Sequence, residues 1–388
     1  MKILLVHCHY RMPGGEDAVF AAERALLERR GHQVIVYERS NEEAAHGAAK
    51  ALLPLHAVWN RRAAREVKDL IKREGVEAVH IHNTLLLLSP AVVRAAKRCG
   101  VPVVQTLHNF RLFCPNGILL RDGRVCEDCP RHGLSCAIRH RCYRGSLAQT
   151  LVVAAAYGLH RRLGTWRGVT MVALTEFDRQ KLLEFNRQYP MFDADRLVVK
   201  PNPVCVPSGP VNPWGDRKNQ MLFAGRLEEL KGLRTVLEAW RLLGDAAPAL
   251  LVAGEGPLGD WARAQNLPNV QFLGQLPRAE LHARMAESRA VVAASLCYES
   301  FALVPAEAHA LGTPVLASGL GNVGASVQPG FDGLCFAPGD ANALAGAVRA
   351  FGQMSFDCNA IAARARRTYS EDENYNALMR FYTKGTIQ

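Results

Sequence analysis

The sequence predicts an α/β protein of two domains, each built on a parallel β-sheet. Short runs of β-branched residues alternate with longer amphipathic stretches, and such alternation favours a parallel sheet with helices on both faces. The chain has 388 residues, which is long for one compact domain. One segment dense in proline and glycine interrupts the alternation, which then begins again, so we expect two such domains.

The first half contains short apolar runs that are typical of buried strands. These candidates are Ile3–Val6, Val34–Tyr37, Ala78–Ile81, Val103–Thr106, Thr170–Leu174 and Leu197–Val199, with helices between them that include Asp17–Arg30, Arg62–Arg73 and Pro90–Cys99. Gly31 and Gly100 stand where helix C-caps are wanted. The first domain is therefore predicted to span residues 1–200.

Residues 201–219 form the expected linker, because proline and glycine at this density cannot continue a helix or a central strand. The strands expected after it are Met221–Ala224, Ala249–Ala253, Val270–Leu273, Ala290–Ala294 and Pro314–Ala317, with helices that include Leu233–Leu242, Ala302–Leu311 and Ala341–Phe351. The second domain is predicted to span residues 201–370. Ligands of parallel sheets bind at the carboxyl ends of the strands, so we expect a cleft between the domains to hold the active site.

Charge and hydropathy narrow the function classes. The formal net charge is +11 and the pI about 9.3, which suits nucleic acid, an anionic membrane or a phosphorylated ligand. No block of five or six basic residues occurs, which argues against a nucleic-acid-binding arm. No stretch approaches the roughly 20 apolar residues that span a bilayer, and the first apolar run is too short for a signal peptide. We expect a cytoplasmic protein, with the inner face of the membrane as a place where it works.

The segment 298–307, Tyr-Glu-Ser-Phe-Ala-Leu-Val-Pro-Ala-Glu, is the strongest chemical signal. It follows an expected strand and opens an expected helix, whose free amides near Ala302–Val304 would suit an anion, and we expect Phe301, Ala302 and Leu303 to contact the donor. Glu299 precedes the helix and Glu307 lies within it, in reach of ribose hydroxyls. On spacing alone, the two glutamates could equally be a capping carboxylate and a solvated helix residue.

Other polar groups follow strand ends in the same way. Arg226 and Lys231, in the segment Gly225–Gly232, could reach a diphosphate, the arginine by a bidentate contact and the lysine as a point charge; a solvated basic loop is the alternative. Three more sets of residues follow strand ends and would point into the cleft. They are Gly14 and Gly15 in Met12-Pro13-Gly14-Gly15-Glu16-Asp17, His108 after Val103–Thr106, and Gly254 and Gly256 in Gly254-Glu255-Gly256-Pro257. Gly254 and Gly256 could line a base pocket. An ordinary tight turn and a structural histidine are the alternatives for the first two sets.

In combination these motifs resemble the retaining glycosyltransferases of family four, which have the GT-B architecture of two facing Rossmann-like domains. The resemblance covers nearly the whole chain in order and includes Val172–Phe177 and Lys200-Pro201-Asn202. The glutamate pair in its strand–loop–helix setting is its most specific part. It implies that the last helix, expected at Glu371–Tyr382 within residues 371–388, crosses back to the first domain.

The resemblance also implies roles for these residues. Arg226 and Lys231 would bind the diphosphate of a UDP- or GDP-sugar, assisted by amides near Gly15 and Leu303, while Glu307 would hold the ribose, Glu299 the sugar hydroxyls, and His108 would sit beside the sugar. Preorganised cations would then replace a catalytic metal, and no Asp-x-Asp motif follows a strand. No residue is an obvious nucleophile, so a front-face route fits the implied retention of configuration.

Residues 110–145 form a cysteine-rich insertion that many members of this family lack. Cys126 and Cys129 have knuckle spacing, and Cys114 and Cys142 could complete a structural zinc site, with Cys136, His132 and His140 as competing ligands. Reduced or disulfide-bonded cysteines that fold a loop are the alternative. The insertion follows His108 directly, so we expect it on the acceptor side.

Residues 146–166 predict an amphipathic helix with basic residues at its end. Its apolar face is Leu147, Leu151, Val152, Ala155, Leu159 and Leu163, with Arg161, Arg162, Arg167 and Trp166 near its end. It could pack into the core or lie at an anionic membrane surface with tryptophan at the boundary. The second reading predicts a lipid-linked sugar or glycan as acceptor, in polysaccharide assembly. Competing functions are a sugar-nucleotide epimerase, a sugar-nucleotide-binding protein without turnover, and a nucleic-acid-binding module.

Overall fold

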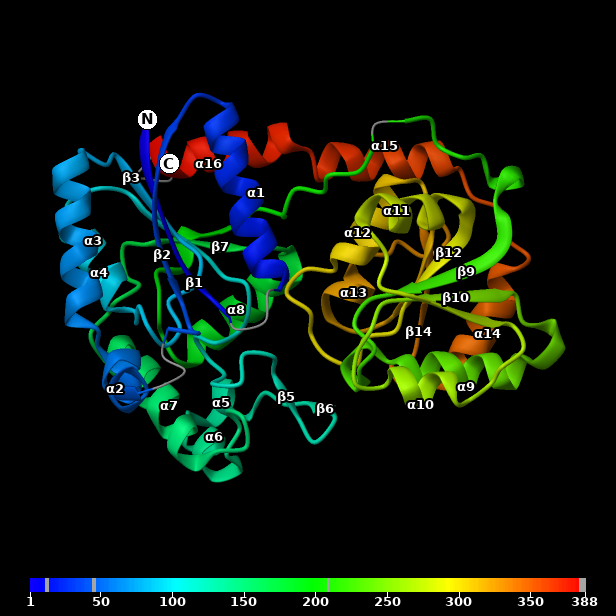
Figure 1. The fold of residues 1–388 in the computed structure, drawn as a ribbon, viewed down its shortest axis with the longest axis horizontal. Helices are drawn as coiled ribbons and strands as arrows, with labels where there is room; N and C mark the ends of the chain where they lie inside the picture. Colours follow the sequence, from blue (N-terminus) through cyan, green and yellow to red (C-terminus); the bar gives the residue numbers. More distant parts are fainter. Residues whose placement is uncertain (11–13, 44–46, 208, 384–388) are drawn as a thin grey trace. The chain divides into compact units, whose positions relative to one another are not determined.

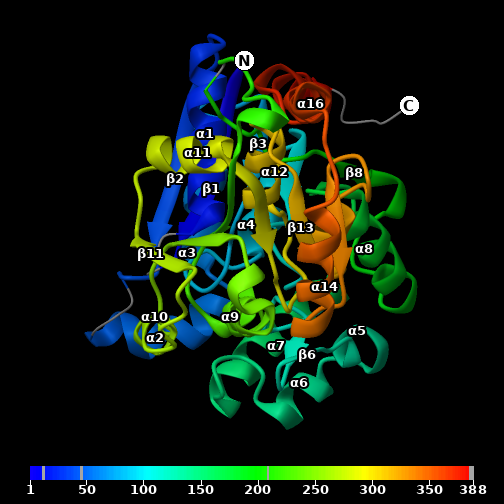
Figure 2. The same ribbon diagram turned by 90° about the vertical axis from the view of Figure 1, so that its right-hand side faces the viewer.

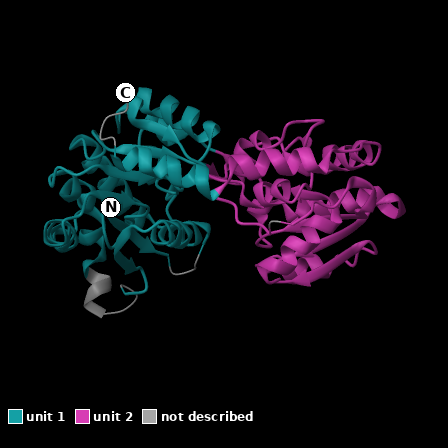
Figure 3. Ribbon diagram, turned by 90° about the horizontal axis from the view of Figure 1, so that it is seen from above, with its two compact units in different colours: residues 1–119, 126–202, 371–388 teal, residues 120–125, 203–370 magenta. Residues whose placement is uncertain are grey.

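The computed structural model describes residues 1–10, 14–43, 47–207 and 209–383. The chain divides into two compact units, which Figure 3 colours separately. The first contains residues 1–119, 126–202 and 371–388, and the second contains residues 120–125 and 203–370. The chain passes from the first to the second at Asn202–Pro203, within the proline-rich segment.

The first unit is built on six parallel strands in the order β2-β1-β3-β4-β7-β8. They are β1 Lys2–His9, β2 Gln33–Ser40, β3 Ala78–Ile81, β4 Val103–Thr106, β7 Thr170–Ala173 and β8 Leu197–Val199, and they confirm the strands expected in this half. Ile3, Leu4, Leu5 and Val6 of β1 are fully buried, because a parallel sheet is covered on both faces.

Helices complete the first unit, and one short hairpin leaves it. They are α1 Gly15–Arg29, α2 Gly47–Val58, α3 Arg61–Glu74, α4 Ala91–Lys97, α5 Asp128–His132, α6 Ser135–His140, α7 Leu147–Arg162, α8 Glu176–Gln188 and α16 Glu371–Thr383, while the hairpin strands β5 Leu120–Arg121 and β6 Arg124–Val125 are grouped with the second unit. Gly31 and Gly100 have φ of 81° and 75°, the left-handed conformation expected of them. Figure 1 shows α2 and α7 together at the end of the sheet toward which β1 runs.

The last helix, α16, packs on the first sheet. It contacts β3 and β4, and its Leu378 and Tyr382 are buried in one cluster with Ile3 and Leu5. Tyr375 adds a hydrogen bond of 2.9 Å to His32 Nε2. The chain therefore ends on the unit in which it began, after passing through the second.

The second unit has another parallel six-stranded sheet, in the order β11-β10-β9-β12-β13-β14. Its strands are β9 Lys218–Ala224, β10 Ala249–Ala253, β11 Val270–Gly274, β12 Ser288–Ala293, β13 Val315–Ser318 and β14 Gly333–Phe336, and its helices are α9 Leu233–Leu243, α10 Gly259–Arg263, α11 Arg278–Glu287, α12 Leu303–Ala310, α13 Gly321–Ala325, α14 Ala341–Phe351 and α15 Cys358–Thr368. Figure 2 gives a second view of these elements. Strand β9 begins inside the segment expected to be linker.

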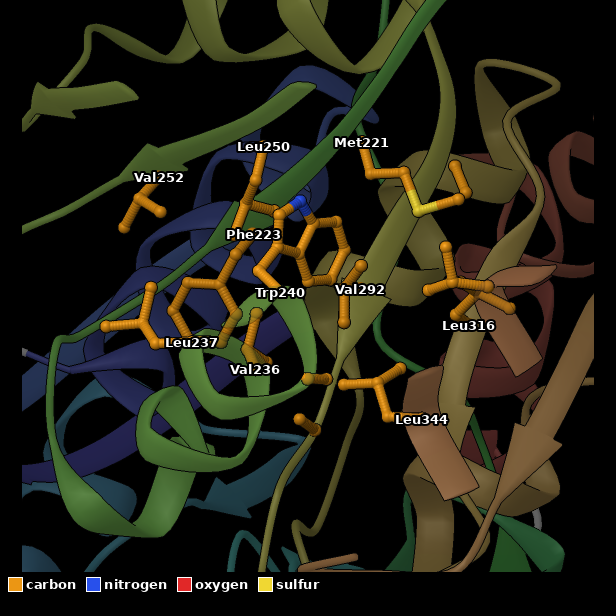
Figure 4. Close-up of a cluster of buried hydrophobic side chains, with 14 of the residues drawn as sticks. Met221, Phe223, Val236, Leu237, Trp240, Leu250, Val252, Val292, Leu316 and Leu344 are labelled. Atoms are coloured by element: carbon orange, nitrogen blue, oxygen red, sulfur yellow. The ribbon is translucent and has the colours of Figure 1, made fainter. Parts of the chain in front are cut away.

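One of the two core clusters that the described residues form in the second unit lies between the sheet and the helices α9 and α14. Trp240 lies among Phe223, Leu250 and Val292 (Figure 4), and its indole N–H donates to the Pro248 carbonyl at 2.8 Å. The ring thus contributes buried apolar area while its polar atom keeps a hydrogen bond.

The structure decides between the two alternatives for Trp166. Trp166 lies beyond the end of α7 and is 1% exposed, with its indole N–H donating to Gln105 Oε1 at 3.0 Å. It is a core residue of the first unit, not a boundary residue at a lipid surface. None of the helices in the described part of the chain is long and apolar enough to cross a membrane.

Candidate active site

The loop after β9 presents two cations in different ways. Lys231 Nζ lies 2.8 Å from Glu299 Oε1, and the lysine side chain is 33% exposed. Arg226 is 55% exposed, and its Nε lies 3.5 Å from Glu228. The structure therefore brings Lys231 and Glu299 together and leaves the Arg226 guanidinium accessible to an anionic ligand.

Glu299 is fixed by more than its lysine. The Ser295 hydroxyl donates to the same carboxylate oxygen, and Asn322 Nδ2 donates to the carbonyl oxygens of Glu299 and Ser300, the latter at 3.1 Å. Burial lowers the pKa of Lys231, but the Glu299 carboxylate more than offsets this and the net pKa is raised. Lys231 is therefore charged at neutral pH, and the Glu299 carboxylate beside it is held in a defined position. Ser295 and Asn322 were not singled out from the sequence, because neither belongs to a motif.

The glycines at the carboxyl edge of the second sheet allow the backbone segments there to approach one another. A Cβ on Gly254 would lie 2.0 Å from the carbonyl oxygen of Gly225, and one on Gly256 would lie 2.5 Å from that of Leu227. Gly225 N donates to Ala253 O at 3.0 Å. Gly254 and Gly256, predicted to line a base pocket, therefore join the loops after β9 and β10, a packing role that the sequence did not reveal.

Helix α12 begins at Leu303, with Ala302 at its N-cap and no side-chain cap. The Leu303 amide donates to Phe301 O at 3.0 Å, and the Phe301 ring contacts Tyr369 at a centroid distance of 5.7 Å. This amide was expected to be free for a phosphate, yet a local turn uses it. Binding an anion there requires that turn to open.

Glu307 is inside α12 and only 4% exposed. Its Oε1 lies 2.7 Å from Arg278 Nη2 and 3.4 Å from His282 Nε2, both on α11. A ribose hydroxyl would share this carboxylate with Arg278. Neither α11 residue was found from the sequence, since nothing local marks a partner almost thirty positions away.

In the first unit, Gly14 and Gly15 stand at the start of α1, while Met12 and Pro13 lie outside the described residues. Asp17 ties this turn to β1. Its Oδ2 accepts from Gly14 N at 2.8 Å, and its Oδ1 lies 2.9 Å from His7 Nε2 and 2.8 Å from His9 Nδ1. The turn is therefore held at the carboxyl end of the first strand.

His108, after β4, is the end of a buried polar chain. Its Nε2 lies 3.0 Å from His82 Nδ1, and His82 Nε2 lies 3.5 Å from Glu23 Oε2. Lys200 Nζ lies 2.5 Å from the other Glu23 oxygen, and the side chains of Glu23 and Lys200 are 0% and 1% exposed. Sequence reasoning missed Glu23 and His82 and named Lys200 only as part of the Lys200-Pro201-Asn202 motif, because the three positions carry no shared pattern.

The row of polar side chains from Lys200 to His108 determines the protonation of His108. Burial raises the pKa of Glu23, but Lys200 and His82 together lower it by more than burial raises it. The net pKa is therefore lowered, and the carboxylate is ionised. His82 Nε2 faces the ionised Glu23 without a hydrogen bond; with the proton on that nitrogen, His82 Nδ1 accepts from His108 Nε2 and His108 Nδ1 is left as an acceptor. Burial lowers the pKa of His108 to about 3. At neutral pH it can accept a hydrogen bond from a sugar hydroxyl but cannot act as an acid.

Two clusters in the described residues could hold a metal ion. They are His7, His9 and Asp17, and Glu23, His80 and His82, with ligand atoms within 4.8 Å of one another in each cluster. In the first, Asp17 already bonds to both imidazoles and caps α1. In the second, the Lys200 ammonium already balances Glu23.

The cysteine-rich insertion gathers part of its predicted zinc site. Cys114 and Cys129 are buried, and Cys126 and Cys142 are partly exposed. Burial raises the pKa of the Cys129 thiol, and the nearby Cys114, Cys142 and Cys136 raise it further. The structure thus associates Cys129 with two of its predicted partners and with the competing ligand Cys136. The zinc site stays a prediction.

Curated relatives match parts of the chain. Over 137 residues it is 39% identical to glycogen synthase of Mycobacterium tuberculosis, a match that covers 34% of this chain and 33% of that protein. The chain thus spans about a third of the length of that relative. Over 320 residues it is 33% identical to D-inositol 3-phosphate glycosyltransferase of a Nocardioides species, covering 73% of this chain and 62% of that one.

Among solved structures, the Anabaena protein Alr3699/HepE in complex with UDP has a TM-score of 0.63 and 16% identity, covering 99% of this chain and 100% of that one. At this identity the similarity concerns the fold. The family described as Glycosyl transferases group 1 matches residues 210–368, and the family described as Glycosyltransferase Family 4 matches residues 13–206. The chain therefore belongs to Glycosyltransferase Family 4 and has the GT-B fold of two parallel-sheet α/β units.

Proposed function

We propose that this protein is a glycosyltransferase that moves a sugar from a UDP- or GDP-sugar to an acceptor. The observation that carries the proposal is the Lys231–Glu299 pair beside the accessible Arg226, at the carboxyl edge of the second sheet. Relatives named as glycosyltransferases and the UDP complex of Anabaena HepE support it.

In the proposed mechanism, charge on the departing nucleoside diphosphate is met by fixed cations. Arg226 contacts phosphate oxygens through two parallel N–H groups and Lys231 acts as a point charge, so no catalytic metal is needed. Glu299 accepts from sugar hydroxyls and Glu307 from the ribose. No side chain of the donor edge is assigned as a nucleophile, so we propose front-face departure and attack with retention of configuration.

Thermal-shift screening against nucleotides and nucleotide-sugars tests this proposal. Stabilisation by UDP or GDP, absent with the free base, is the expected result. Formation of an isomerised nucleotide-sugar without acceptor would identify an epimerase instead. Strong salt-dependent binding to DNA or RNA, with no response to nucleotides, would identify a nucleic-acid-binding module.

The proposed acceptor is a lipid-linked sugar or glycan used in cell-surface polysaccharide assembly, reached by peripheral contact with an anionic membrane at its inner face. The exposed leucines of α7 support this contact, since Leu147, Leu151 and Leu159 recur every four or eight residues on one face. Sedimentation with anionic vesicles at low and high salt tests it, and salt-sensitive binding is expected.

A structural zinc ion is proposed for the cysteine insertion, held by Cys114, Cys126, Cys129 and Cys142. Four thiolates close a tetrahedral site and leave no open catalytic position. Elemental analysis is expected to find one zinc per chain, and a metal-free protein would contradict the assignment.

A further inference from the structure

A cavity of about 540 Å³ lies wholly within the first unit, at the carboxyl edge of its sheet. Its floor comes from residues that follow strand ends, Tyr10 after β1, Asn41 after β2, and Leu85 with Leu86 after β3. Its walls are α2 and α7, which pack against each other. The volume is that of a site for a small organic molecule.

The walls of this cavity are hydrocarbon. The apolar lining residues are Leu53, Pro54, Ala57, Leu85, Leu86, Ala148, Val152 and Val153. The polar lining residues are fewer, namely Tyr10, Asn41, Tyr143, Arg144 and Gln149. Along the apolar part of this lining a sugar would leave hydroxyls without partners, which costs free energy for each one, whereas an alkyl or prenyl chain would not.

Two lining residues hold an unusual backbone conformation. Leu86 has φ of 72° and Arg144 has φ of 55°, a left-handed region that side chains with a Cβ rarely adopt. The Arg144 guanidinium lies 5.5 Å from the centre of the Tyr143 ring, which is itself a lining residue. Such conformations persist where surrounding structure enforces them and cluster at ligand sites.

The outer faces of the same two helices are also apolar. In the described part of the chain, the exposed large hydrophobic side chains are Leu52, Leu55, Leu147, Leu151, Leu159, Leu163 and Leu242, and all but Leu242 belong to α2, α7 or the α7 C-cap. Leu55 is 68% exposed. Such a concentration on one pair of helices marks an interaction surface.

The two helices that wall the cavity contain basic residues and no acidic residue, although Glu16 lies near the lining residue Tyr10. No aspartate or glutamate occurs between Asp128 and Glu176, a stretch that contains Arg131, Arg139, Arg141, Arg144, Arg161, Arg162 and Arg167. None occurs between Glu43 and Glu66 either, the stretch that contains α2. An occupant with a hydrocarbon chain and an anionic head complements both properties.

We propose that this cavity binds the hydrocarbon chain of a lipid-phosphate acceptor, with its phosphate beside Arg144. The proposal rests on the proposed transferase function and specifies its acceptor. In this arrangement the exposed leucines of α2 and α7 contact the bilayer surface. The cavity binds the hydrocarbon chain of one lipid molecule from that bilayer. The carboxyl edge that carries His108 then receives the head of the same lipid.

Calorimetric titration of the full chain with dodecyl phosphate, below its micelle concentration, tests the proposal. Ala148→Trp fills the cavity, and Ala155→Trp is its matched control, since both alanines are exposed on α7 and only Ala148 lines the cavity. We expect at least tenfold weaker binding for Ala148→Trp and no change for Ala155→Trp. Val152→Trp, from the same wall, repeats the test if Ala148→Trp does not fold.

The phosphate contact is tested with Arg144→Gln. This change is expected to weaken dodecyl phosphate about fivefold and to leave neutral dodecyl maltoside unchanged, because one basic group near a lipid surface contributes about that much. Equal binding of dodecyl phosphate by the two tryptophan variants, or none by the wild type, would overturn the proposal. UDP binding measured in the same proteins separates the lipid-binding proposal from the transferase proposal. A wild-type protein that does not bind UDP would contradict the transferase function itself.

Discussion

At the scale of single residues, two lysines at opposite ends of β9 serve as a test residue and its control. Lys231 follows the carboxyl end of the strand and pairs with Glu299, while Lys218 begins the strand and pairs with Glu287 at 2.7 Å. We expect Lys231→Ala and Arg226→Ala each to lower the rate of sugar transfer by about 10²–10³, because each removes one charge-stabilising contact. Lys218→Ala should leave the rate unchanged.

Initial rates of donor consumption measure this effect, with circular dichroism to verify the fold. Both site cations are partly exposed, so their loss should cost little stability. Transfer at the wild-type rate by both variants would remove these residues from the donor site.

The buried Glu23–Lys200 pair gives a second residue-scale prediction. Glu23→Gln leaves an ammonium uncompensated in a site without solvent, and we expect it to lower the free energy of unfolding by about 3–5 kcal/mol. Replacing both partners, with Lys200→Met, should restore part of this loss. Urea unfolding measures it, and a Glu23→Gln protein as stable as the wild type would show that the charges are not buried together.

Residues next to strand ends could be found from the sequence, and their partners could not. Lys231 and Glu299 each follow a predicted strand, and carboxyl ends of parallel strands meet at one edge. Glu23 and Lys200 are 177 positions apart, and only the packing of α1 against the end of β8 joins them. The pairing of Glu307 with Arg278 was beyond prediction for the same reason.

At the scale of elements, the turn into α9 depends on one glycine. Gly232 has φ of 72°, and a Cβ there would lie 2.0 Å from the Ala294 carbonyl oxygen. Gly244 at the other end of α9 has φ of 58° with nothing within 4 Å. Both changes to alanine strain the backbone, but only Gly232→Ala also forces β12 and this turn apart.

We therefore expect Gly244→Ala to lower the free energy of unfolding by about 1 kcal/mol and Gly232→Ala by clearly more. Thermal unfolding of the two variants beside the wild type measures the difference. Equal losses would mean that the Ala294 contact relaxes without cost.

The elements themselves were largely predictable, because burial on both faces leaves long apolar strands. Strand β14 was not, since it lies at the sheet edge with Cys335 exposed and contains a glycine. The place of Trp166 was left open, because its position beside arginines suits a membrane boundary as well as it suits the core. Only the tertiary contact with Gln105 decides between the two.

At the scale of the molecule, buried histidines predict a pH dependence of stability. Burial lowers the pKa of His108 to about 3, that of His160 to about 4, and those of His80 and His82 well below the usual 6.5. These groups stay neutral in the folded chain while the unfolded chain takes up protons. Their contribution to stability is therefore present above pH 6.5 and lost as pH falls from 6.5 toward 4.

Urea unfolding at pH values from 7.5 to 4.5 measures this loss. Each such histidine contributes at most about 1.4 kcal/mol per pH unit, so the summed slope should be steep. His160→Gln should reduce this slope by up to about 1.4 kcal/mol per pH unit, the contribution of one titrating histidine. Stability that does not change over this range would contradict the burial of these rings.

The most direct test of the central claim is transfer itself. Purified protein, in which elemental analysis has shown that the cysteine site keeps its state in EDTA, is incubated in EDTA with labelled UDP- and GDP-sugars and a lipid extract that supplies acceptors. The account predicts release of the nucleoside diphosphate and label in the lipid phase, both lost in Arg226→Ala and Lys231→Ala. Donors that stay intact, label confined to an isomerised nucleotide-sugar, or transfer that Mg²⁺ alone restores would contradict it.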